Sequence, residues 1–248
     1  MSCNPVHPFP GLDPVESSSG PGVRTLPSRF SQALATRRRR QMVLGALFPV
    51  IVAAGWLSPL VGFFIPLCMA LGLGLAAFHG RTWCDWLCPR GSFEDAWLAR
   101  LSRNTRIPEV FRRVPLRLAV LAFLMAMLTW QLLVRWPDPY AIGAFFVLLL
   151  TVTTAVAVVL GVIYHPRTWC YLCPIGTLAH WLGKNRRPLA LAAEQCTTCQ
   201  LCTRRCPMQL APVALKAAPR MPSGGDCLKC GLCVATCPRQ ALSFEKAA

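Results

Sequence analysis

Eight cysteines near the C-terminus stand in two runs that share one spacing. CTTCQLCTRRCP is followed by CLKCGLCVATCP, and both fit Cys-x2-Cys-x2-Cys-x3-Cys-Pro. This is the bacterial pattern for [4Fe–4S] clusters, in which three cysteines of one run and the fourth of the other bind the same cluster. The sequence therefore predicts two clusters. Their ligands would be Cys196, Cys199, Cys202 and Cys237 in cluster 1, and Cys227, Cys230, Cys233 and Cys206 in cluster 2.

Zinc is the alternative for these cysteines, because zinc sites made of four cysteines also use Cys-x2-Cys pairs. Two four-cysteine runs of identical spacing, each ending in Cys-Pro, favour iron–sulfur clusters instead. Residues 188–248 resemble a bacterial two-cluster ferredoxin, which is a small α+β domain. That resemblance implies one-electron transfer, with the chemistry done by the cluster rather than by a side chain.

Four more cysteines belong to a motif that the chain repeats. HGRTWCDWLCPRGS starts at His79 and HPRTWCYLCPIGT at His165, with one more residue between the cysteines of the first copy. Two cysteines cannot hold a [4Fe–4S] cluster alone, but two copies lying side by side would supply four thiolates. We predict a third cluster; a redox-active dithiol or disulfide and a purely structural role are the alternatives. The cysteines concerned are Cys84, Cys88, Cys170 and Cys173.

The same motif supplies two histidines and two candidate helix starts. His79 and His165 stand at the ends of expected helices, so they are candidates for hydrogen bonding to a quinone. Haem ligation and a structural hydrogen bond are the alternatives. After each motif, Ser92 or Thr177 is expected to be a helix N-cap, and the helix after Ser92 is expected to lie at the membrane interface.

The composition indicates a membrane protein. Only 15% of the residues are charged and the mean hydropathy is +0.44, whereas a soluble domain carries about a quarter charged residues. The uncharged run 41–78 would reach roughly 57 Å as one helix, about twice the hydrocarbon core. It is therefore expected to form two helices, 42–58 and 60–78, and the chain then continues into helices 118–134 and 140–164.

The positive charges predict the orientation in the membrane. The formal net charge is +16, and all Lys and Arg except Arg135 lie before residue 41, in 79–117 or after residue 164. All three segments fall on the same side of a four-helix arrangement. The positive-inside rule places this side, with both termini and the clusters, in the cytoplasm, so the protein would be a multi-pass protein of the cytoplasmic (inner) membrane. The basic excess therefore needs no nucleic acid as a partner.

The predicted fold is an all-α membrane domain of two repeated helical hairpins, followed by a small α+β ferredoxin domain. Residues 1–40 are expected to form a disordered basic tail, because they are rich in Pro, Gly and Ser. Residues 41–187 would form the four-helix membrane domain, and 188–248 the two-cluster domain.

Residues 41–248 resemble the NapH family, and related NosR-like and CcoG-like proteins share this core. The resemblance rests on the cysteine motifs after helices two and four and on the double ferredoxin run. It implies a quinol dehydrogenase membrane component that passes electrons between the quinone pool and a partner redox protein in a respiratory reductase system. The second motif departs from the family, because its cysteines are separated by two residues.

Two other functions also fit this sequence. The first is a membrane reductase that serves the maturation, metal balance or thiol balance of another metalloprotein. The second is an anchoring subunit whose clusters are structural.

Overall fold

The computed structural model describes residues 28–218 and 224–245. Four helical spans are long and apolar enough to cross a hydrocarbon core of about 30 Å, the second of them being the helix Phe64–His79 together with the turn Pro59–Phe63 that precedes it. No more than 22% of any such span is buried within the protein, so most of the apolar surface is left for lipid. The helices are α1 (Ser28–Leu57), α2 (Phe64–His79), α5 (Val114–Arg135) and α6 (Pro139–Ile163).

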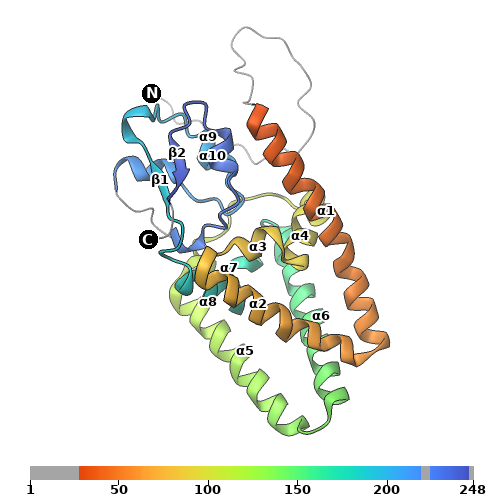
Figure 1. Ribbon diagram of the computed structural model, residues 1–248. Coiled ribbons are helices and arrows are strands. Elements are labelled where there is room, and N and C mark those ends of the chain that lie inside the picture. The colour runs from red at the N-terminus through yellow and green to blue at the C-terminus, as the bar shows by residue number, and fades with distance from the viewer. Residues whose placement is uncertain (1–27, 219–223, 246–248) are drawn as a thin grey trace.

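The long helices form two hairpins that turn at the same end of the molecule (Figure 1). In the first hairpin, a 3₁₀ turn, η1 (Pro59–Phe63), joins α1 to α2. In the second hairpin, Asp138 caps the start of α6, where its carboxylate accepts a hydrogen bond from the backbone N–H of Tyr140 at 2.9 Å. The cysteine-rich segments and the C-terminal region lie at the opposite end. The predicted fold, a helical membrane domain followed by a small ferredoxin-like region, is confirmed.

Each hairpin is followed by two short helices that meet at a Cys-Pro pair. The first pair is α3 (Thr82–Trp86) and α4 (Pro89–Ala96). The second pair is α7 (Trp169–Leu172) and α8 (Pro174–Leu182). Proline suits the first position of a helix because its missing N–H would have had no partner there.

The expected N-caps are wrong, because both helices begin earlier than predicted. Cys88 and Cys173 occupy the cap positions, and the Cys88 sulfur accepts from the backbone N–H of Gly91 at 3.4 Å. Ser92 and Thr177 lie inside the helices and are fully buried.

The C-terminal region is small and closed by a two-stranded sheet. Strands β1 (Leu189–Leu191) and β2 (Leu242–Phe244) pair antiparallel, so the start and end of the region are held together. Two short helices, α9 (Leu201–Arg204) and α10 (Leu232–Thr236), each follow the first cysteines of a run. Its core is made of Leu189, Leu215, Cys233 and Leu242.

Residues 28–40, expected to belong to the disordered tail, are helical and continue α1. Arg37 is 7% exposed, and its guanidinium lies 2.6 Å from Asp85 and 2.5 Å from Asp95. Gln41, one turn further on, donates to Asp95 at 2.9 Å. These contacts fix the helix against the first cysteine motif, which local composition could not reveal. The remainder of the predicted tail, 1–27, lies outside the described residues.

The hairpins touch backbone to backbone at two glycines. A Cβ on Gly62 of η1 would collide with the carbonyl oxygen of Gly143, and a Cβ on Gly143 with that of Pro59. By contrast, a Cβ on Gly74 of α2 would meet nothing within 4 Å.

We therefore expect Gly143→Ala to lower the thermal midpoint of the detergent-solubilised protein. Overpacking of this kind costs about 1–3 kcal/mol. The matched Gly74→Ala variant is expected to leave the midpoint unchanged or to raise it, since alanine favours a helix by up to about 1 kcal/mol. Tryptophan fluorescence during heating measures both, and equal midpoints for the two variants would contradict the backbone contact.

Candidate metal centres

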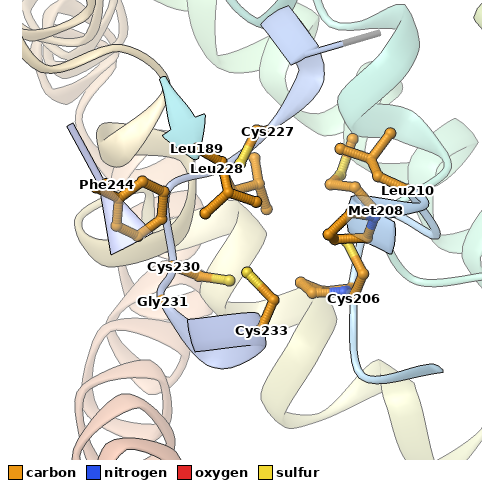
Figure 2. A pocket seen from close by; sticks show the side chains of 12 residues that line it. Leu189, Cys206, Met208, Leu210, Cys227, Leu228, Cys230, Gly231, Cys233 and Phe244 are labelled. Atoms are coloured by element: carbon orange, nitrogen blue, oxygen red, sulfur yellow. The ribbon is translucent and has the colours of Figure 1, made fainter. Parts of the chain in front are cut away.

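One cavity in the C-terminal region gathers the four cysteines predicted for cluster 2. Figure 2 shows the side chains around it. The remaining lining is mostly apolar, with Leu189, Leu228 and Phe244 on one side and Met208 and Leu210 on another. The cysteines are Cys206, Cys227, Cys230 and Cys233.

A second cavity gathers the four cysteines predicted for cluster 1. It is lined in part by Leu191, Val213 and Leu242. Each cavity is therefore lined by three cysteines of one run and the fourth of the other. The cysteines of the second cavity are Cys196, Cys199, Cys202 and Cys237.

Left-handed backbone conformations at equivalent positions of the two runs turn these loops. The residue two after the first cysteine has φ 52° at Thr198 and 55° at Lys229. The residue after the second cysteine has φ 58° at Gln200 and 80° at Gly231. Only one of these four residues is glycine, so the residue types alone do not predict the turns. Equivalent strained turns give the two runs the same path around their cavities.

Zinc and a [4Fe–4S] cluster place different demands on four cysteines. Among the described residues, no three Cys, His, Asp or Glu side chains converge on a single-ion site. A tetrahedral zinc site needs such convergence, with Zn–S distances of about 2.3 Å. A [4Fe–4S] cluster takes one thiolate at each of four irons, so its ligand sulfurs stand further apart. Three cysteines from one run and the fourth from the other line each cavity, which is the ligand distribution of a two-cluster ferredoxin.

Burial makes these thiols poor thiolates without a metal. Burial raises the pKa of Cys206 to about 11 and that of Cys88 to about 12. At neutral pH both would keep their protons unless a metal took the place of the proton, as happens when thiols ligate.

Crossed arginines hold the two membrane-edge motifs together. Arg81 of the first motif donates from Nη2 to the carbonyl oxygen of Cys170 at 2.8 Å. Arg167 of the second motif donates from Nη1 to the carbonyl oxygen of Cys84, also at 2.8 Å. The two arginine side chains are 1% and 0% exposed. The copies therefore lie side by side, as the repeat predicts.

The glycine of each motif makes room for the arginine of the other. A Cβ on Gly91 would lie 3.0 Å from Nη1 of Arg167. A Cβ on Gly176 would lie 2.8 Å from Nη2 of Arg81 and 2.6 Å from the carbonyl oxygen of Cys170. These contacts explain why Arg and Gly recur in both copies of the motif.

The four membrane-edge cysteines (Cys84, Cys88, Cys170 and Cys173) form what we call the membrane-edge site. After burial, the charge of Cys84 is the largest cause that raises the pKa of Cys88, and it also raises those of Cys170 and Cys173. Together with the crossed hydrogen bonds of Arg81 and Arg167, this mutual influence is consistent with the two cysteine pairs facing each other across the repeat.

Buried positive charge exceeds negative charge beside this site. Asp226 accepts from Arg81 at 2.9 Å and lies 3.0 Å from Arg117 and 2.8 Å from Nδ1 of His180. In the described structure, Nε of Arg81 and both Nε and Nη2 of Arg117 have no hydrogen-bond partner. Burial also raises the pKa of Glu94 to about 7. At neutral pH this carboxyl is therefore only partly ionised and offsets less of the positive charge. Because unpaired buried charge is costly, this environment suits an anion such as a thiolate-ligated cluster.

Two buried hydroxyls also fit such a group. Ser92 Oγ and Thr177 Oγ1 occupy equivalent positions in the two motifs, are fully buried and have no hydrogen-bond partner in the described structure. Each lies four residues after a cap cysteine and so on the same helix face as that cysteine. Hydrogen bonds to the sulfurs are one way in which proteins tune iron–sulfur clusters.

The two motif histidines have different surroundings. His79 is exposed at the end of α2. His165 is 8% exposed, its Nδ1 accepts from the backbone N–H of Arg167 at 3.2 Å, and burial lowers its pKa to about 4. A neutral His165 is thus part of the scaffold that positions Arg167.

The acidic partners of the crossed arginines are not predictable from the sequence motifs. Arg167 lies 2.6 Å from Asp95 and 3.2 Å from Asp85, whereas Arg81 pairs with the distant Asp226. The arginines carried a signal, since they recur in both motifs. The acidic residues carried none, because neither Asp85 nor Asp95 has a counterpart in the second copy.

The fold and these sites define a class of protein, namely a helical protein with spans suited to a membrane and cysteine centres of the iron–sulfur type. The family model described as a 4Fe-4S binding domain matches residues 61–108 and again 142–190, each match containing one membrane-edge motif. The model of a 4Fe-4S dicluster domain matches residues 195–242. The chain is therefore an iron–sulfur protein of the ferredoxin type, and its domains imply electron transfer.

The chain is also similar to an uncharacterized protein of Methanocaldococcus jannaschii. The two are 28% identical over 145 residues, which is 56% of each chain. The chain thus spans about half the length of this curated relative. No solved structure matches the chain significantly.

Proposed function

We propose that the protein is a membrane-bound electron-transfer subunit, similar to NapH, that exchanges electrons between the quinone pool and a partner redox protein. In this proposal it serves a respiratory reductase system in the cytoplasmic membrane, with its clusters on the cytoplasmic side. The arginine-rich segments at the cluster end support that orientation through the positive-inside rule.

The observation that carries the proposal is the contact between the membrane-edge site and the cluster 2 cavity. One core cluster includes Tyr171, Met208 and Leu228. Cys84 and Cys170 of the membrane-edge site pack against it, and so do Cys206 and Cys227 of the cluster 2 cavity. A redox centre at the ends of the membrane helices would therefore adjoin the next centre directly.

The proposed ligands follow the cavities and the motif. Four cysteines would hold a third [4Fe–4S] cluster at the membrane edge, and the two cavities would hold clusters 1 and 2. When bound, the clusters supply one-electron transfer. The ligands proposed for the third cluster are Cys84, Cys88, Cys170 and Cys173.

The chain's own residues hold the segments that carry these centres together. Tyr171, which follows Cys170, is fully buried, and its hydroxyl donates to the carbonyl oxygen of Met208 at 2.7 Å. Met208 in turn lies two residues after Cys206. This bond ties a ligand segment of one site to that of the next. For the quinone, we propose a site near the membrane edge, with His79 and His165 as the side chains to test.

The proposal is tested with the full chain, loaded anaerobically and placed in lipid nanodiscs. We expect a long-chain quinol to reduce at least one cluster, or a long-chain quinone to re-oxidise clusters reduced beforehand. Low-temperature EPR detects both reactions. If neither occurs, the exchange with the quinone pool is wrong, and a maturation reductase or an anchoring role would remain.

A further inference from the structure

The cluster 1 cavity differs from the other cysteine sites in its exposure. Cys199 is the only exposed cysteine among the thirteen that the structure describes, whereas Cys233 of the other cavity is buried. Gln195, Thr197 and Gln200, which also line the cluster 1 cavity, are intermediate or exposed at the surface. A cluster held there would lie close to the protein surface.

The two other sites are covered. Cys206 and Cys227 of the cluster 2 cavity face the membrane-edge cysteines across one shared core. Figure 1 places α9, which carries Cys202, at the end of the molecule opposite to the hairpin turns. Electrons that enter at the membrane edge would therefore leave by the cluster 1 cavity.

One basic side chain lines this cavity, and two more lie on or against segments that carry its cysteines. Arg239 lines it and is exposed. Lys216 is exposed and donates from Nζ to the carbonyl oxygen of Cys196 at 2.8 Å. Arg204 is exposed on α9, two residues after Cys202. We call these three residues the basic rim.

The rim carries more positive than negative charge. Glu194 is acidic and immediately precedes Gln195, which lines the cavity. The basic rim has three positively charged side chains, compared with this one carboxylate. A rim of one sign around a redox centre steers partners of the opposite sign and raises their association rate by about 10–10³-fold.

We propose that the basic rim is the docking site for a soluble redox protein whose surface is acidic around its own one-electron cofactor. This inference rests on the proposed function and names the partner that meets cluster 1. In each encounter, one electron passes from reduced cluster 1 to the oxidised cofactor of the partner, or back. No bond is made or broken.

The test starts from full-length protein in nanodiscs without quinone, reduced by dithionite that is then removed. Stopped-flow spectroscopy measures electron transfer to an acidic flavodoxin and, separately, to a basic cytochrome c. The native protein is expected to react faster with the flavodoxin, at a rate that falls as salt is added. The variant Arg204→Glu/Arg239→Glu is expected to lose about 10-fold or more of this rate and to gain rate with the cytochrome. Lys216 stays unchanged because it supports a ligand segment.

The matched control reverses two exposed arginines outside the rim, Arg103→Glu/Arg106→Glu. It is expected to keep the native rates with both acceptors. The proposal is overturned if the rim variant keeps the native rate with flavodoxin, or if the control variant loses as much rate. Binding to anionic lipid vesicles is measured separately, and a rim variant that loses this binding but keeps its rate with flavodoxin also overturns the proposal. EPR of cluster 1 verifies that the rim variant retains its cluster. Because dithionite rather than quinol supplies the electrons, this experiment does not depend on the quinone reaction. A negative result here would therefore concern the docking site alone.

Discussion

Replacing Cys84 and Cys170 with serine is expected to disconnect the ferredoxin clusters from the quinone pool while leaving both clusters in place. The double change removes one proposed ligand from each motif and so eliminates the membrane-edge cluster. Cys206 and Cys227 lie behind these residues in the shared core, so no other redox centre would bridge the gap to the membrane helices.

The measurement is the re-oxidation of the reduced ferredoxin clusters by a long-chain quinone in the same nanodisc. In the native protein their EPR signals should disappear, whereas in the variant they should persist over the same period. The matched control is Cys68→Ser, a cysteine of α2 outside every motif. Native re-oxidation in the Cys84/Cys170 variant would show that the membrane-edge site is no part of the path.

Replacing Arg167 with methionine is expected to destabilise the protein by about 3–5 kcal/mol, as for other broken buried ion pairs. The change leaves Asp85 and Asp95 buried with Arg37 as their remaining basic partner. It also removes the hydrogen bond to the carbonyl oxygen of Cys84. The free energy of unfolding, measured by denaturant titration in mixed micelles, gives the loss directly.

The pH dependence of this loss identifies its cause. Burial opposes the ionisation of Asp95, but Arg167 and Arg37 outweigh it and hold its pKa below the usual range. In the native protein the resulting stability is fully present at neutral pH and is lost only as the pH falls through that low folded-state pKa. Without Arg167 the folded-state pKa rises, so the destabilisation should be smaller near pH 5 than at pH 8.

The control for this variant is Arg38→Met, which changes an exposed arginine on the same helix as Arg37. Its free energy of unfolding should stay within about 0.5 kcal/mol of the native value. A similar loss for both variants, or a loss at Arg167 that does not change with pH, would contradict the buried ion pairs.

Repetition made much of this protein predictable from its sequence. The two cysteine runs indicated which cysteines share a cavity, because a fixed loop length limits where each thiol can reach. The repeated motif after helices two and four likewise indicated that two hairpins meet at one place. In both cases the second copy supplied information that a single occurrence lacks.

Contacts between residues far apart in the chain were not predictable. Arg37 was assigned to a tail, yet it pairs with Asp85, 48 positions away, and Arg81 pairs with Asp226, 145 positions away. Nothing local distinguishes a buried arginine from its exposed neighbours Arg38 and Arg39. The predicted helix starts at Ser92 and Thr177 are wrong for a related reason. Cys88 and Cys173 occupy the cap positions, but their place in a cysteine motif indicates metal binding rather than helix capping.

In the proposed electron path, the membrane-edge cysteines hold a third cluster at which the path begins. Iron and acid-labile sulfide should be counted per chain in native protein purified and kept under anaerobic conditions. Three [4Fe–4S] clusters predict about twelve irons and about twelve sulfides. A count of about eight of each, in protein whose two ferredoxin clusters give full EPR signals, would contradict the claim.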